Sequence, residues 1–461
     1  MPRSSVSEPV AGQSQKSPVP RAVVIGAGVA GLAAAAALAD EGWRVVVLEK
    51  EDDVGGRCRT VRQGGCLFDT GAQHFHDSYD DTLNTAIRAG LGETFRVPNE
   101  PKGIYHDGRL STFIPRELNP SRAIPWGAIG LEGLADLGVV APRLLAHYRS
   151  YNIKFPHWWS EGDDVTAARF LARRSTARYR RNIADPASLY AMGAGIDDIS
   201  AAAFMVALRY TFGDRTGAFT GGMGSLPEAL ARKAKVITGM TATEVVREGR
   251  KATGVRAVPA AGGRARTYKG DVVICALPAK VVPAVAGKLG RAAKEVAGAV
   301  EYAPAIVVNL ALSRANAAPG GPLMIARGAD IDAAWACQST SKAAEFAPAG
   351  RAVATVVFAG PDAQAFIDRK DGAVIDAASA ACSKLFGARA AKPRQARVDR
   401  HPLAFPVVSP GHASRVRTLF AEGSGVGNLL LAGDWTTSPT VEGAVSSGLN
   451  AARRALAQRA R

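Results

Sequence analysis

The sequence lacks several features that would restrict its class of function. No apolar run approaches the ~18 residues that a transmembrane helix needs, so we expect no membrane span. The 461 residues include only five cysteines, and none of them forms a C-x-x-C pair. We therefore expect no metal site, and an odd cysteine count in a long chain indicates a reducing compartment such as the cytoplasm. Internal repeats and coiled-coil heptads are also absent.

Acidic residues are outnumbered by basic ones. The chain has 57 Lys and Arg against 41 Asp and Glu, which gives a net charge of +16. Part of the excess is local, because six arginines fall between residues 169 and 181. This segment is either a solvated helical face or a surface for an anionic membrane or an acidic partner. No recognition module accompanies the charge, so nucleic acid is not an expected partner.

The chain is long and apolar enough to form more than one domain. Hydrophobic residues make up 47% of it, which is ample for a large core. Residues 1–20 differ from the rest, since they are rich in Ser, Pro and Gln and have no apolar centre. They predict a disordered tail and not a signal peptide.

The most informative stretch runs from residue 21 to residue 59. A short, mostly β-branched run at residues 22–25 predicts a strand that is buried on both faces. It leads into a G-x-G-x-x-G motif formed by Gly26, Gly28 and Gly31. In a strand–loop–helix unit the first glycine permits a tight turn and the second lets a pyrophosphate approach the backbone. The third lets the helix pack close to the sheet.

The segment after the glycines completes a dinucleotide-binding unit. An alanine-rich helix runs to residue 39, and its amino end presents free N–H groups and partial positive charge to phosphates. Residues 44–48 predict a second strand, which Glu49 closes 18 residues after Gly31. A carboxylate there can accept both hydroxyls of an adenosine ribose, which favours a free ribose over a 2′-phosphate.

Three further motifs resemble those of known flavoproteins. Gly55-Gly56-Arg57 resembles the second phosphate clamp of glutathione-reductase-type proteins, in which a guanidinium serves a diphosphate. FDTGAQHF at residues 68–75 resembles the segment that passes the isoalloxazine ring in the flavin-containing amine oxidoreductase superfamily. LLLAGDWTTSPTVEGA at residues 429–444 is similar to that family's closing FAD motif, in which a helix amino terminus faces the N1–C2=O edge of the flavin.

The resemblance covers nearly the whole chain and implies FAD as the cofactor. PASLYAMGAGIDDIS and GGMGSLPEAL resemble the branch of protoporphyrinogen oxidases and carotenoid (phytoene) desaturases, although His401 stands where tryptophan is usual in that branch. No cysteine lies in the closing motif, so we expect noncovalent FAD. The residues that the resemblance places around the cofactor are Gly26, Gly28, Ala30, Gly31, Glu49, Lys50, Gly56, Arg57, Gly71, Ala72, Gln73, His74, Val245, Gly433, Asp434, Val441, Gly443 and Ala444.

The expected fold is α/β, with a Rossmann-type, glutathione-reductase-like FAD-binding domain and a discontinuous α+β substrate-binding domain. β-prone runs between residues 301 and 359 predict an antiparallel sheet that floors a substrate cavity. Residues 124–147 carry few charges and are either a core helix pair or an apolar entrance patch that touches lipid. The FAD-binding domain is expected to comprise residues 21–80, 220–300 and 420–461, and the substrate domain residues 81–219 and 301–419.

The chemistry implied by the resemblance is transfer of a hydride from a substrate C–H bond to flavin N5. Amine oxidases of the family usually carry a lysine on the strand that aligns with APAIVVNL at residues 303–310, which has none. The paired aromatic cage for an amine is not evident in TTSPTVEGA either. Both absences favour desaturation or ring oxidation of a bulky hydrophobic substrate that is polyene- or porphyrinogen-like. No catalytic residue is assigned, and His74, His76 and Tyr302 are the weak candidates.

Two alternatives stay open. An amine or amino-acid oxidase would use the same scaffold. A flavin-binding scaffold without turnover would need an occluded cavity above the flavin. The electron acceptor, oxygen or a quinone, and the oligomeric state do not follow from the sequence.

Overall fold

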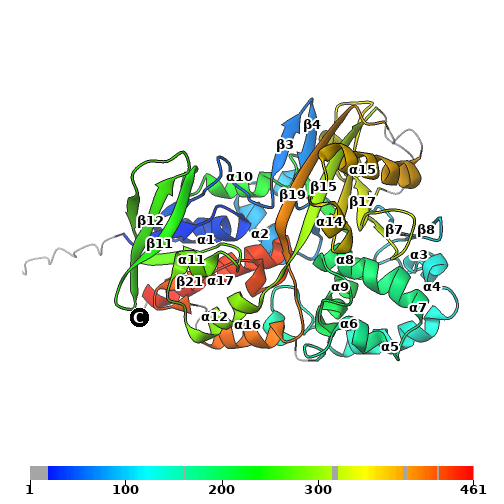
Figure 1. The fold of residues 1–461 in the computed structure, drawn as a ribbon, viewed down its shortest axis with the longest axis horizontal. Coiled ribbons are helices and arrows are strands. Elements are labelled where there is room, and N and C mark those ends of the chain that lie inside the picture. Colours follow the sequence, from blue (N-terminus) through cyan, green and yellow to red (C-terminus); the bar gives the residue numbers. More distant parts are fainter. Residues whose placement is uncertain (1–18, 160, 314–319, 388–391, 423–424, 460–461) are drawn as a thin grey trace, which may run out of the picture.

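The computed structural model describes residues 19–159, 161–313, 320–387, 392–422 and 425–459. Two large sheets organise these residues, one toward each side of the molecule (Figure 1). Most of the predicted disordered tail, residues 1–18, lies outside the described residues. Pro20, the last residue of that predicted tail, is buried, and its carbonyl accepts a hydrogen bond of 2.8 Å from Arg44 N. The prediction of a disordered tail is therefore wrong for Pro20, which is held against Arg44 of the fold.

The first large sheet contains the glycine motif. Its strands are β1 (Arg21–Ile25), β2 (Arg44–Leu48), β10 (Lys235–Ile237), β14 (Val272–Cys275), β20 (Gly425–Val426) and β21 (Leu429–Leu431). They lie in the order β10-β2-β1-β14-β21-β20, and all neighbours are parallel except β20 and β21. The valine-rich strands β1 and β2 are largely buried on both faces, as parallel strands between helices must be.

Two helices from opposite ends of the chain cover this sheet together. Helix α1 (Val29–Asp40) joins β1 to β2, and helix α17 (Val441–Arg459) packs along it (Figure 1). A glycine allows the close approach, because a Cβ on Gly448 would lie 2.0 Å from Ala30 O. The beginning and the end of the described chain are thus fixed to each other beside the glycine motif.

The second large sheet comes from the middle of the chain. Its strands are β7 (Lys102–His106), β8 (Arg109–Phe113), β15 (Tyr302–Leu312), β16 (Leu323–Ile325), β17 (Trp335–Gln338), β18 (Ala352–Ala359) and β19 (Gln395–Pro406). The order is β19-β15-β18-β17-β16-β7-β8, and every pair is antiparallel except β16 with β7. The sheet is therefore mixed at one pair, because β7 arrives from an earlier excursion of the chain.

Small sheets and helices fill the remaining space. The small sheets consist of β11 (Met240–Glu248), β12 (Lys251–Pro259) and β13 (Arg266–Lys269); of β3 (Thr60–Gln63) and β4 (Cys66–Asp69); and of β5 (Phe75–His76), β6 (Phe95–Arg96) and β9 (Thr216–Phe219). Helices outside the helical lobe described next are α2 (Asp80–Arg88), α10 (Ser225–Ala231), α11 (Val282–Ala286), α12 (Arg291–Ala299), α13 (Ser339–Lys342), α14 (Pro361–Phe366), α15 (Asp371–Phe386) and α16 (His412–Ala421).

A helical lobe lies below the second sheet in Figure 1. It contains α3 (Pro120–Ala123), α4 (Trp126–Ile129), α5 (Gly133–Ala146), α6 (Ala167–Leu171), α7 (Ala177–Tyr179), α8 (Asp185–Met192) and α9 (Ala201–Gly213). Helix α9 is apolar on nearly all sides and is buried, as a helix without a polar face must be. Helix α5 is also apolar, but it lies at the surface and leaves Leu134 and Leu145 exposed.

The arginine-rich segment at residues 169–181 is divided between two roles. Arg178 donates to the carbonyls of Gly127 and Ala128, at 2.7 and 3.1 Å, and so holds helix α4. Arg169, Arg173 and Arg174 are exposed, so only part of the segment forms a solvated basic face.

The described residues include no helix that is both long and apolar enough to cross a bilayer. The strands of the glycine-containing sheet and those of the mixed sheet come from separate stretches of sequence. The proposed residue boundaries between an FAD-binding and a substrate-binding domain stay a prediction.

Candidate active site

Three glycines shape the loop between β1 and α1, each for a different reason. Gly26 has a left-handed backbone (φ 97°), and a Cβ there would lie 2.9 Å from Ala276 O. A Cβ on Gly31 would lie 2.0 Å from Gly26 O, so the helix can approach the strand only without a side chain. Gly28 differs, because a Cβ there would meet no atom within 4 Å. The space next to Gly28 is therefore open, as the approach of a phosphate requires.

Glu49, at the end of β2, holds this loop in place. Its buried carboxylate accepts a hydrogen bond of 2.7 Å from Ala27 N and one of 3.0 Å from Glu51 N. Glu49 thus fixes the glycine loop through the N–H of Ala27. The motif alone did not predict this role. Lys50 points to solvent and pairs with Glu51 at 3.0 Å.

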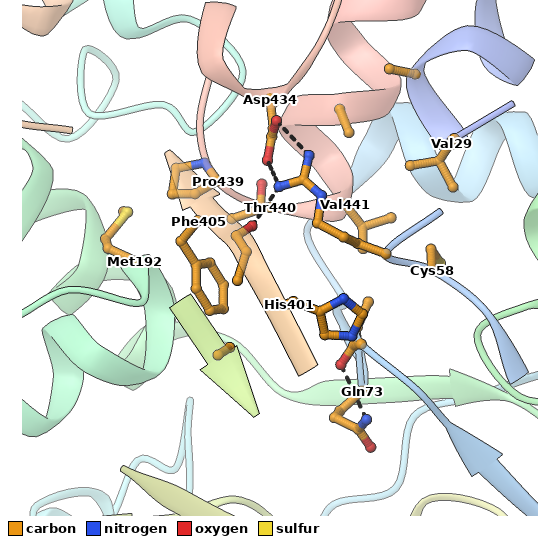
Figure 2. Close-up of a pocket in the computed structure, with 18 of the residues that line it drawn as sticks. Val29, Cys58, Gln73, Met192, His401, Phe405, Asp434, Pro439, Thr440 and Val441 are labelled. Carbon is orange, nitrogen blue, oxygen red and sulfur yellow. Dashed lines mark hydrogen bonds and ion pairs between the residues drawn. The ribbon is translucent and has the colours of Figure 1, made fainter. Parts of the chain in front are cut away.

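Arg57 and Asp434 join two motifs that lie far apart in the sequence. The guanidinium donates two parallel hydrogen bonds, of 2.8 and 2.9 Å, to the Asp434 carboxylate, and it also donates to Ala404 O (Figure 2). Paired geometry of this kind fixes both side chains more firmly than a single contact would. The preceding Gly433 has φ 139°, and a Cβ there would lie 2.7 Å from the indole nitrogen of Trp435. Arg57 is therefore a structured part of the site and not a solvated surface residue.

Hydrogen bonds to its backbone carbonyl groups hold the segment FDTGAQHF in place. The amide of Gln73 donates to Asp69 O at 2.7 Å, and a ring nitrogen of His401 lies 2.7 Å from Thr70 O. From the other side the buried ammonium of Lys342 donates to Gln73 O and lies 4.0 Å from the Asp69 carboxylate. These contacts hold the segment rigidly along one wall of a cavity.

That cavity encloses about 1350 Å³, part of which is open to solvent. Its walls come from the second sheet, from the loops that follow β1, β14 and β21 of the first sheet, from the α1 and α17 amino ends and from α8. Of the predicted cofactor residues, the cavity is lined by Gly28, Ala30, Arg57, Gly71, Ala72, Gln73, His74, Gly433, Asp434, Val441 and Ala444. The others, Gly26, Gly31, Glu49, Lys50, Gly56, Val245 and Gly443, lie behind the wall or outside the cavity.

Aromatic side chains form one region of the cavity wall. Tyr190 stacks on His74, with 5.3 Å between ring centroids, and its hydroxyl lies 2.7 Å from a ring nitrogen of His74. Trp335 meets both rings edge-on, at 5.6 and 5.5 Å. His76 stacks on Tyr79 at 5.1 Å. All of these residues line the cavity, so this region is a polar-edged aromatic surface.

Both histidines of this region are held neutral. Burial, together with the buried ammonium groups of Lys342 and Lys102, lowers the pKa of His74 well below its usual value. Burial, Lys102 and His74 lower the pKa of His76 in the same way. Lys102 is itself buried, donates to Thr211 O at 2.8 Å, and has its pKa lowered to about 7 by burial. The imidazoles in this wall therefore resist protonation and stay uncharged.

The remaining candidates from the sequence have structural contacts. Tyr302 accepts a hydrogen bond of 2.9 Å from Ala279 N and does not line the cavity. Cys58 does line it, but its thiol donates to Met223 O, and burial raises the pKa of that thiol. A protonated thiol is a poor nucleophile, which supports the expectation of noncovalent cofactor binding. The described residues contain no group of His, Cys, Asp and Glu side chains that could hold a metal ion.

The arrangement fits a dinucleotide. Gly28 leaves open the space that a Cβ would fill, and the amino ends of α1 and α17 both reach the cavity, where they favour negative charge. Arg57 lines the same place, where its charge is paired with that of Asp434. These features meet from opposite ends of the chain at one cavity.

Comparison with known proteins agrees with this geometry. The family described as flavin-containing amine oxidoreductase matches residues 29–456. This chain belongs to that family. Its fold class and the FAD cofactor, both predicted from the motifs, are thereby confirmed.

Individual relatives of the family are similar over short stretches. Phytoene desaturase of Fusarium fujikuroi is 42% identical over 73 residues, which are 14% of this chain and 13% of that protein. Polyamine oxidase 4 of Oryza sativa subsp. japonica is 37% identical over 90 residues, 19% of this chain and 18% of that protein. Such alignments span about a fifth or less of the curated relatives.

A solved structure covers the whole chain. A provisionally assigned protoporphyrinogen oxidase from Exiguobacterium sp. 255-15 matches with a TM-score of 0.71 and 19% identity, over 98% of this chain and 100% of that one. At that identity the likeness shows the family fold alone.

Several residues at or near the cavity were not found from the sequence. Tyr190 lies in a segment that resembles the desaturase branch, but nothing in that segment indicates that it meets His74, 116 residues away. Lys102 and Lys342 are lysines without a motif, and only the folded chain shows that they are buried.

Proposed function

We propose that this chain is an FAD-dependent oxidoreductase that removes a hydride from a bulky hydrophobic substrate by desaturation or ring oxidation. Bound FAD would supply the hydride acceptor, N5 of its isoalloxazine ring. The chain's own residues would bind the nucleotide, position the substrate against it and exclude water. The substrate is polyene- or porphyrinogen-like in its reacting region.

The charge of the cavity wall carries this proposal. Among the lining residues only Arg57 and Asp434 carry charge, and they neutralise each other. The lining histidines His74, His76 and His401 all have a lowered pKa, chiefly because they are buried. A neutral, aromatic and aliphatic wall favours an uncharged substrate, because burying an unpaired ionic group there would be costly. Within the proposed class, this favours a polyene over a substrate that carries carboxylates.

The strand β15 supports the same conclusion. It presents Ala305 and Val307 to the cavity, in the region where amine oxidases of the family usually carry a lysine. Neither side chain can hold a water molecule by a hydrogen bond or accept a proton. Hydride removal from a resonance-stabilised carbon needs little such help, whereas an amine must first be neutral.

Anaerobic reduction of the holoprotein tests the proposal. The flavin absorbance should bleach when polyenes or porphyrinogens are added without oxygen. No hydrogen peroxide should form in air with a panel of mono-, di- and polyamines. Peroxide from an amine, without bleaching by any apolar substrate, would overturn the proposal.

A second candidate is an amine oxidase. The rings of Tyr79, Tyr190, Tyr210 and Trp335 face one cavity, and aromatic faces attract cations. The same peroxide assay decides between the two.

We further propose that the protein is cytoplasmic and that helix α5 brings it to an anionic lipid surface, from which an apolar substrate enters. Leu134 and Leu145 on α5 are 51% and 73% exposed, and Leu131 just before the helix is 85% exposed, so this surface is unusually apolar. Exposed Arg173 and Arg174 lie in the segment next to α7, which packs on α5, and would meet lipid phosphates. The chain that leaves α5 reaches the cavity at Ile153.

A further inference from the structure

A second recess lies at the edge of the first sheet that is opposite to the cofactor cavity. It encloses about 1990 Å³, part of which is open to solvent, and it shares no lining residue with that cavity. We call it the basic groove, after its lining cations Arg21, Arg44, Arg250, Lys251 and Arg459. Arg21 and Arg44 begin β1 and β2, whereas the glycine loop follows the far end of β1. The 5 residues of β1, at about 3.3 Å each, separate the groove from that loop by roughly 16 Å.

The charge of the basic groove is almost all of one sign. Asp271 is the one acid among its described lining residues, and it pairs with Arg21, whose backbone N donates to it at 2.8 Å. The other four cations are exposed and form no ion pair with any described residue. Glu248 lies opposite Lys251 in the β11–β12 hairpin, but it is outside the groove lining. Cations gathered in one recess repel each other, so the groove attracts an anionic occupant.

The elements around the groove disfavour a compact phosphate group. Helix α17 ends here at Arg459, so it brings carbonyl oxygens and partial negative charge instead of free N–H groups. The first N–H groups of β1 and β2 are also occupied, since Arg21 N donates to Asp271 and Arg44 N donates to Pro20 O. The recess is larger than the roughly 300–1,000 Å³ of a small-molecule pocket. It therefore suits an extended occupant.

Three other occupants fit the groove poorly. Trp43 is the one aromatic residue of the described lining and is only 6% exposed, so no open ring face is offered to a nucleic-acid base. A bilayer is too flat to enter a recess, and α5, the helix proposed to touch lipid, lies toward the other end of the molecule (Figure 1). The tail sequence before Val19 carries Arg3, Lys16 and Glu8, so its charge does not complement the groove.

We propose that the basic groove binds an acidic peptide segment of a partner protein. Exposed guanidinium groups can each hold a carboxylate in paired geometry, and their long side chains adapt to its position. Acids at alternate positions of an extended peptide lie on one side of it, about 6.6 Å apart. Val19, which is 56% exposed, adds an apolar contact in the same groove. A partner held there leaves the cofactor cavity free.

Fluorescence anisotropy of the holoprotein with a fluorescein-labelled peptide of alternating Glu and Ser tests the proposal. The same peptide with Gln in place of Glu should bind about tenfold more weakly. Raising NaCl from about 50 to 300 mM should weaken the Glu peptide by a similar factor, because exposed ion pairs are screened by salt.

Substitutions locate the binding. Arg44→Gln/Arg250→Gln should weaken the Glu peptide about fivefold, since each exposed ion pair contributes modestly. The matched control is Arg88→Gln/Arg109→Gln, which removes the same charge from exposed positions outside the groove and should bind like the wild type. Asp271→Asn removes the one acid of the described lining and should bind about twofold more tightly. An unchanged flavin absorbance spectrum shows that each variant is folded.

A carbodiimide that joins carboxylates directly to amines gives a test that needs no variant. Lys251 should be the lysine that becomes linked to the Glu peptide, as mass spectrometry would show. Linkage to other lysines only, or equal affinity of the groove variant and its control, would overturn the proposal. It would also be overturned if the Glu peptide did not bind. Displacement of the peptide by inorganic pyrophosphate, single-stranded DNA or phosphatidylserine vesicles at lower concentrations of charge would assign the groove to that class of anion instead.

Discussion

Gly28 and Gly31 belong to the same motif, yet the structure makes opposite predictions for them. Gly28 has an ordinary backbone conformation (φ −71°) and open space beside it, so Gly28→Val should fold. Its side chain would fill the phosphate space, and we expect the variant to purify colourless, with FAD affinity reduced at least 100-fold. Absorbance at 450 nm and titration with FAD measure this.

Two matched substitutions control that experiment. Gly31→Ala should destabilise the protein itself, because its Cβ would lie 2.0 Å from Gly26 O. Gly298→Ala on α12 meets no atom within 4 Å, so it should leave FAD content unchanged and raise stability by up to about 1 kcal/mol. If the Gly28→Val protein purified yellow and fully loaded with FAD, the β1–α1 loop would not be the binding site of the nucleotide.

Glu442 gives a pH-dependent prediction. It is fully buried in the first turn of α17, where its carboxylate accepts from Asp81 N and Thr82 N at the start of α2. Burial raises its pKa from 4.5 to about 7, so the folded state binds the proton more tightly than the unfolded state does. Its contribution to stability is therefore fully present below pH 4.5 and is lost as the pH rises toward 7.

Urea unfolding across that pH range measures the effect. The wild-type free energy of unfolding should include a decline of up to about 1.4 kcal/mol per pH unit that is missing in Glu442→Gln. Identical pH slopes in the two proteins would contradict the assignment to Glu442.

At the scale of single residues, the sequence predicts local roles well and distant partners poorly. The separate roles of Gly26 and Gly31 follow from their spacing, and the structure shows the predicted close contacts. The bond between Arg57 and Asp434 joins residues 377 apart, and that between His74 and Tyr190 joins residues 116 apart. No spacing rule encodes such contacts, because they depend on how two sheets are placed against each other.

At the scale of elements, hydrophobic periodicity predicts strands whose sequences are plainly β-branched. β1 and β2 lie within one residue of the predicted ranges. The longest strand, β19, was not predicted as a strand, because QARVDRHPLAFP contains three charged residues and two prolines. Its neighbour β15 supplies the pairing that its own sequence does not indicate.

Helix α5 shows why one of the two interpretations of residues 124–147 could not be chosen from the pattern. An apolar pattern predicts a buried helix, but the helix is buried only if the rest of the fold packs around it. The exposed leucines of this region, Leu134 and Leu145 on α5 and Leu131 just before it, predict lipid contact. The double variant Leu131→Ser/Leu145→Ser should bind phosphatidylserine–phosphatidylcholine vesicles about tenfold or more weakly in flotation assays.

The control for lipid binding is Ile87→Ser, which changes an exposed apolar residue (61% exposed) on α2. It should float like the wild type. Vesicles of phosphatidylcholine alone should bind less than anionic vesicles, because the neighbouring arginines contribute attraction. Equal flotation of the double variant and the wild type would contradict contact through α5, and a protein partner for this face would then be the better explanation.

At the scale of the whole molecule, one cavity is shared by elements that are otherwise separate. The β1–α1 loop and α17 supply one side, and β15, β17 and β19 supply the other. A ligand that fills such a cavity binds only when both sheets are in place, so it stabilises the folded state by its binding free energy. At a free FAD concentration of about 1,000 times Kd the gain is about 4 kcal/mol.

This coupling predicts one cooperative unfolding transition whose midpoint rises with FAD concentration. Differential scanning calorimetry of apoprotein across a series of FAD concentrations measures it, with riboflavin, which lacks the pyrophosphate and adenosine, as the ligand control. Gly28→Val should show almost no shift, because its cavity cannot accept the pyrophosphate. If FAD moved only one of two resolved transitions, the nucleotide would be held by one sheet alone, and the shared cavity would not be the cofactor site.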